Sequence, residues 1–167
     1  MRAALLVPVS VLVLGLAAAP ASAQPCGPLT FGFSGTGAGF APFGGTPPVL
    51  SGAAMSVLAP PSCSLTFILT PAPALALSQV GVLVIGATNP MLNLGIYGYP
   101  TCTARASLDV VLILGTGPAP GTLSLTIPIP PRTTFLGVST FQQCALIQLG
   151  LTGLSAFLSN GVRMDIT

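Results

Sequence analysis

The chain has 167 residues, a mean hydropathy of +0.92 and a formal net charge of +2, and only 4% of its residues are charged. It contains no His, Lys, Glu or Trp. Most enzyme mechanisms need a tuned acid, base, nucleophile or metal ligand, so we expect a protein that is not an enzyme and that holds no cofactor or metal. Since basic residues form no cluster, we expect no nucleic-acid partner either.

The first 23 residues have the pattern of a cleavable export signal. Arg2 gives a short positive region, residues 3–19 are mostly apolar, and Ala21-Ser22-Ala23 matches a signal-peptidase site. A membrane anchor is the alternative, but the apolar run is short for spanning and has no basic flank after it. We therefore expect residues 1–23 to be a signal peptide and the protein to be secreted or at the cell surface, with the periplasm as an alternative.

The rest of the chain divides into two parts. Residues 24–48 form a segment rich in Gly, Pro and Phe, which we expect to be a loose loop before a first strand near Val49. Residues 49–167 combine frequent Pro and Gly, which disfavour helices, with short alternating segments typical of an all-β sandwich or barrel. We predict one all-β domain, an antiparallel Greek-key or immunoglobulin-like β-sandwich, without a transmembrane helix.

Several segments predict individual strands, because one face of a strand takes every second residue. The predicted inward residues are Cys63, Leu65, Phe67 and Leu69; Cys102, Ala104, Ala106, Leu108, Val110, Leu112 and Leu114; Leu123, Leu125, Ile127 and Ile129; and Val162, Met164 and Ile166. Residues 80–86 are apolar on both parities, which predicts a central strand covered on both faces. Residues 133–151 predict one or two strands with a bend near Gly137, or a short helix at 141–148. Asn160-Gly161 predicts a hairpin turn into the last strand.

Four cysteines follow the predicted signal: Cys26, Cys63, Cys102 and Cys144. An even number in an exported chain predicts two disulfides, with three connectivities open. Free or metal-bound thiols are the alternative, although the chain has no C-x-x-C pair and no His to build a zinc site.

A few other side chains are candidates for binding. Tyr97 and Tyr99 would lie on one side of an extended segment and offer an aromatic platform for a sugar or peptide, or else cover one end of the sandwich. Asp109 and Asp165 each follow an Arg closely, which favours exposed ion pairs over a catalytic or calcium site. The glutamines at 142, 143 and 148 suit buried amides that bond to loops.

Several short motifs occur in a fixed order along the mature chain. They are Cys26–Pro28, residues 98–103, residues 121–130, residues 135–137, residues 141–143 and residues 158–166. In this order they resemble an uncharacterised family of exported β-sandwich domains common in planctomycetes and other environmental bacteria, often the C-terminal unit of longer secreted proteins. The chain differs from this pattern at Phe141, where an aromatic hydroxyl is common, and at residues 149–153, where a loop rich in Asp and Pro is usual.

The resemblance implies a small exported Greek-key-like sandwich with no known activity. It also implies that Cys26 pairs with Cys102, which leaves Cys63 to pair with Cys144. We therefore expect a secreted or cell-surface, non-catalytic structural or adhesive domain, or alternatively a module that binds carbohydrate or another small ligand. The expected partners are an extracellular glycan or other surface proteins, and the sequence does not predict the oligomeric state. A structural or adhesive domain, which acts by packing against a partner, should expose an apolar surface or an open strand edge.

Overall fold

A computed structural model of the chain describes residues 23–26, 29–41, 46–58, 61–70, 78–97, 102–117, 121–130, 133–150 and 153–167. The predicted signal therefore lies almost wholly outside the described residues. The strands are β1 Ala23–Cys26, β2 Leu29–Thr36, β3 Val49–Leu58, β4 Pro61–Thr70, β5 Ser78–Gly86, β6 Leu92–Asn93, β7 Thr103–Ala104, β8 Val110–Thr116, β9 Leu123–Ile129, β10 Ser139–Gly150 and β11 Gly153–Ile166. Apart from 3₁₀ turns at Leu94–Tyr97 and Thr133–Phe135, the described chain has no helix, so the prediction of an all-β protein is confirmed.

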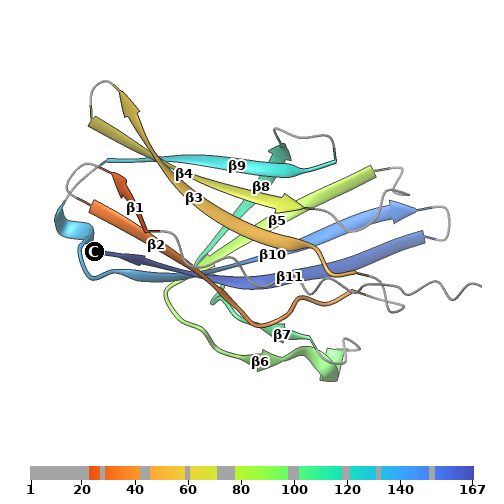
Figure 1. Cartoon of the computed structure of the whole chain (residues 1–167). Coiled ribbons are helices and arrows are strands. Elements are labelled where there is room, and N and C mark those ends of the chain that lie inside the picture. Colours follow the sequence, from red (N-terminus) through yellow and green to blue (C-terminus); the bar gives the residue numbers. More distant parts are fainter. Residues whose placement is uncertain are drawn as a thin grey trace, which may run out of the picture.

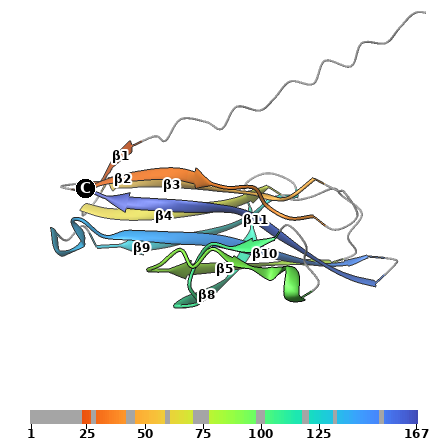
Figure 2. The ribbon, with the colours of Figure 1, turned by 90° about the horizontal axis from the view of Figure 1, so that it is seen from below.

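One antiparallel sheet contains nine of these strands, in the order β1-β2-β11-β10-β5-β8-β9-β4-β3 (Figure 1). β8 joins its two halves, because residues 110–114 pair with β5 and residues 115–116 pair with β9. The sheet rolls up, so that β3 at one end of the order contacts β2 and β11 near the other end. Figure 2 shows β2 and β3 on one side of the molecule and β5 and β8 on the opposite side. The result is a nearly closed barrel, in place of the two separate sheets of the predicted sandwich.

The core lies inside this rolled sheet. Leu65, Phe67 and Leu69 on β4 are buried, as are Val162 and Met164 on β11. Phe67 meets Phe33 of β2 edge to face, with ring centroids 6.4 Å apart, a geometry that aromatic pairs prefer. The predicted inward faces of residues 63–70, 123–129 and 162–166 are all confirmed, because their members are buried or packed against the buried cluster.

Asn160 closes the roll from β11 to β3. Its Oδ1 accepts a hydrogen bond from the backbone N–H of Leu50 at 2.8 Å, and its Nδ2 donates to the carbonyl oxygen of Leu50 at 3.2 Å. The predicted hairpin turn at Asn160-Gly161 is therefore wrong. Both residues lie inside β11, and the chain instead reverses between Gly150 and Gly153, which pair with each other.

The predicted strand at residues 102–114 is wrong in its middle. It is split into β7 and β8, and Leu108, predicted to point inward, is 78% exposed. Oδ2 of Asp109 accepts hydrogen bonds from the N–H of Ala87 at 2.7 Å and from the hydroxyl of Ser107 at 2.9 Å. Such bonds from Asp and Ser compete with a strand ladder, so the strand restarts only at Val110.

Two further expectations need revision and one is confirmed. Within residues 24–48, the predicted loop contains β2, whose Phe31 is completely buried. β5 is central in the sheet as predicted, but its outer face is not covered, because Val80 is 43% exposed. The predicted bend occurs at Gly137, which has a φ of 79°, and β10 follows it. Such a positive φ suits glycine because it has no Cβ.

Candidate functional site

The outer side of the sheet carries a continuous apolar surface over β8, β5, β10 and β11. We call it the apolar sheet face. It consists of Val80, Val82, Val111, Ile113, Ala145, Ile147, Leu149, Leu154 and Ala156. The most exposed members are Ile113 at 70% and Leu154 at 74%. Its members carry no charge, and Ser78, the exposed strand partner of Leu149, is the polar side chain at its edge, whereas polar residues normally alternate with buried ones along a solvated strand face.

The register of the strands places these side chains in rows across the sheet. Val82 is the direct partner of Ile113 on β8 and of Ala145 on β10. In the next row, Ile147 is opposite both Val80 on β5 and Ala156 on β11. Adjacent strands lie about 4.8 Å apart and residues rise about 3.4 Å along a strand, so the face covers roughly 300 Å². Patches of this size on monomeric proteins are often functional.

The inner residues of the same strands explain why the outer ones are exposed. Leu83, Cys144 and Leu146 alternate with members of the apolar sheet face and are completely buried in the core. Strands that alternate in this way must turn the remaining residues outward. The exposed side chains therefore result from the burial of their neighbours on the inner face, and covering them requires a further layer of structure.

Gln143 marks the border of the apolar sheet face. Its Oε1 accepts a hydrogen bond from the N–H of Arg105 at 2.9 Å, and its Nε2 donates to the carbonyl oxygens of Thr103 and Ser159 at 3.1 and 3.0 Å. These bonds hold the segment around β7 against the outside of the sheet. The prediction that glutamines 142, 143 and 148 are buried is confirmed, and Gln143 does bond to a loop.

The cysteines do not pair as the resemblance implies. Cys102 and Cys144 are both free and buried, so the pairings Cys26–Cys102 and Cys63–Cys144 are wrong. Cys102 directly precedes β7, which lies outside the main sheet (Figure 1). Cys144 points into the core from β10, which is separated from the strand of Cys63 by β5, β8 and β9 in the sheet order. The side chain of Cys26 lies outside the described residues.

The two free thiols have low nucleophilic reactivity. Burial raises the pKa of Cys144 to about 12, and it also raises the pKa of Cys102. Because the thiolate is the reactive form, neither thiol suits a nucleophile at neutral pH.

The two carboxylates occupy separate, structural positions. Asp165 forms a salt bridge with Arg163 at 2.8 Å and accepts a hydrogen bond from Ser139 at 2.5 Å. The hydrogen bond from Ser139, together with Arg163, holds its pKa below the usual value. Asp109 has its pKa lowered by hydrogen bonds from the Ala87 N–H and from Ser107. The predicted ion pair therefore forms at Asp165, whereas Asp109 bonds to a neighbouring loop.

The proposed aromatic platform lies beyond what the structure describes. Tyr97 ends a 3₁₀ turn, but its side chain and the whole of Tyr99 lie outside the described residues. In the described part, no helical segment reaches the length and apolar character needed to cross a membrane. The comparisons with known proteins found no matching family model, curated protein or solved structure.

Sequence reasoning missed the apolar sheet face, although a signal for it was present. Residues 80–86 and 110–114 are apolar on both parities, a pattern that for residues 80–86 predicts coverage on both faces. The same pattern also arises when one face is left for a partner, and composition alone does not separate the two cases.

Proposed function

We propose that this protein is an exported, non-catalytic structural or adhesive β-domain, of the family that it resembles in sequence, and that it assembles through the apolar sheet face. The observation that carries the proposal is the continuous, uncharged row of exposed Val, Ile and Leu side chains across four strands. Exposed apolar patches mark sites of association, because burying them removes apolar surface from water.

A second copy of the same chain is the partner that this surface fits best. In an interface with two-fold symmetry, the same surface patch of both copies is buried, so a charged side chain in the patch lies close to a like charge on the other copy. The apolar sheet face has none, and the described charges at Arg163 and Asp165 lie on a different part of β11. Sheets also stack face to face about 10 Å apart with interdigitating side chains. A face of roughly 300 Å² on each copy is small for a stable complex, so we expect weak association in the micromolar range or above.

Export is supported by one feature besides the leader. Cys63 is disulfide-bonded, and disulfides persist mainly in oxidising compartments outside the cytosol. With Cys102 and Cys144 free, Cys26 is the one cysteine of the sequence left as its partner within the chain. We therefore propose one disulfide in place of the two expected from the sequence.

Carbohydrate binding is the alternative, and a different surface would carry it. Sugars are recognised by aromatic rings together with polar groups that bond to hydroxyls, and the apolar sheet face offers neither. A glycan site would have to involve Tyr97 and Tyr99. Binding of soluble glycans that is lost on replacing both tyrosines by alanine would favour this alternative.

Sedimentation equilibrium of the mature chain tests the proposal. We expect concentration-dependent dimers in the wild type, and Ile113→Ser should weaken the dimer about tenfold because it replaces one of the most exposed apolar side chains of the face by a hydroxyl. Ile96→Ser is the matched control, since Ile96 is 81% exposed but lies on the 3₁₀ turn at Leu94–Tyr97, outside the four strands that form the face. A wild type that stays monomeric up to about 1 mM, or equal weakening by both substitutions, would overturn the proposal.

A further inference from the structure

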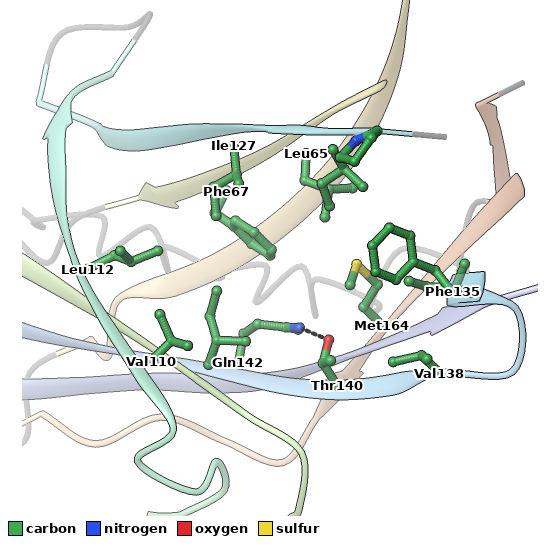
Figure 3. Close-up of a pocket in the computed structure, with 14 residues that line it drawn as sticks. Leu65, Phe67, Val110, Leu112, Ile127, Phe135, Val138, Thr140, Gln142 and Met164 are labelled. Carbon is green, nitrogen blue, oxygen red and sulfur yellow. Dashed lines mark hydrogen bonds between the residues drawn. The ribbon is translucent and has the colours of Figure 1, made fainter. Parts of the chain in front are cut away.

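A second feature lies inside the rolled sheet. A cavity of about 390 Å³ separates β4 and β9 from β10 and the neighbouring strands (Figure 3). Leu65, Phe67, Leu112, Phe135 and Met164 are among the side chains that line it. Protein cores leave few voids larger than one water molecule. A volume of this size falls within the lower range of small-molecule pockets.

The cavity is open to solvent. Val110 and Val138 line it and are 46% and 38% exposed, and Pro130, another lining residue, is exposed too. Their exposure gives an apolar entrance. Among the residues that the structure describes, no charged side chain lines the cavity, so the described lining is favourable for an apolar molecule.

One polar side chain lies among these apolar residues without full bonding. Gln142 is completely buried and its Nε2 donates to the hydroxyl of Thr140 at 2.5 Å (Figure 3). Its Oε1 is buried and has no hydrogen-bond partner. An unsatisfied buried carbonyl is costly and calls for an explanation. Of the buried polar atoms without a partner in the described part of the chain, this one alone belongs to a residue that lines the cavity.

We propose that the cavity binds a neutral aliphatic molecule that carries one hydroxyl group. The hydrocarbon would pack among Leu65, Phe67 and Met164, and the hydroxyl would donate its hydrogen bond to Oε1 of Gln142. The terminal torsion of a glutamine is soft, so the amide can turn Oε1 toward the ligand. A carboxylate is disfavoured, because the described lining has no cation to pair with it and an unpaired buried charge is unfavourable.

Two isomeric probes test this inference. 1-Octanol and 1-methoxyheptane have the same formula, but only the alcohol can donate a hydrogen bond. Titration of the mature chain, followed by calorimetry and by NMR shifts of the cavity methyl groups, should show 1-octanol binding roughly tenfold more tightly than the ether. Octanoate at pH 8 should not bind. Failure of 1-octanol to bind, or equal binding of the alcohol and the ether, would overturn the inference.

Three variants locate the site. Gln142→Met keeps the length of the side chain and removes its carbonyl, so it should abolish the preference for 1-octanol over the ether. Val110→Phe should block both probes by filling the entrance. Val49→Phe is the matched control, because Val49 is 54% exposed on β3 and belongs neither to the cavity lining nor to the apolar sheet face, and it should leave 1-octanol binding unchanged. Equal effects of the two phenylalanines would contradict the assignment. The two probes on the wild-type protein decide the question even if a variant does not fold.

Discussion

Replacing Asn160 by alanine should destabilise the fold. With the exception of Gln143, we expect no other Asn or Gln side chain to cost as much stability when it is removed. Asn160 is the partner of both backbone polar groups of Leu50, whose side chain is 2% exposed. Alanine leaves the N–H and the carbonyl of Leu50 without these bonds. Each unsatisfied group costs about 1–3 kcal/mol when buried, and partial access of water reduces the sum to about 2–4 kcal/mol. For a domain of this size, the melting temperature should fall by roughly 10 °C.

Urea unfolding followed by far-ultraviolet circular dichroism measures the effect, because the chain has no Trp for fluorescence. Asn93→Ala is the matched control. Asn93 is exposed and its Oδ1 accepts only the local N–H of Gly95 at 2.7 Å, so its loss should cost less than about 1 kcal/mol. If Asn160→Ala unfolds at the wild-type urea concentration, or matches Asn93→Ala, Asn160 does not hold β3 against β11.

Two further predictions follow from the titrating groups. The pKa of Asp165 is lowered in the folded state, chiefly by Ser139, so the unfolded chain binds more protons in acid and stability falls as the pH drops from about 5 through the folded-state pKa. Asp165→Asn should flatten this dependence without abolishing it, since the pKa of Asp109 is lowered too; an unchanged pH profile of the urea midpoint would contradict the assignment. Cys102 and Cys144 should resist iodoacetamide at pH 8 in the native protein and react as two thiols per chain after unfolding without reductant. Zero or four alkylated thiols in unfolded, unreduced protein would show that the thiol assignment is wrong.

The sequence predicted those parts of the fold that depend on local alternation. Leu65, Phe67 and Leu69 point inward because a strand with a period of two can bury only one of its faces, and the same rule located Val162 and Met164. This pattern describes single strands. It does not determine whether the strands form two sheets or one rolled sheet, since that depends on which strands pair across long distances.

The wrong predictions arose where distant contacts override local signals. Asn160-Gly161 is a strong turn motif by itself, but its amide bonds to Leu50, which lies 110 residues earlier in the chain. Residues 29–36 look like a flexible segment in composition, yet they pair with β11. The bond between Asp109 and Ala87 likewise spans 22 residues. None of these partners is visible from neighbouring sequence.

Methyl NMR of the mature chain at increasing concentration tests the central claim, association through the apolar sheet face, most directly. We predict that the methyl signals of Val82, Ile113 and Ile147 shift together between about 20 µM and 1 mM, while those of the buried Leu83 and Leu146 stay in place. Spectra that do not change with concentration, or shifts that map to another surface, would contradict assembly through this face.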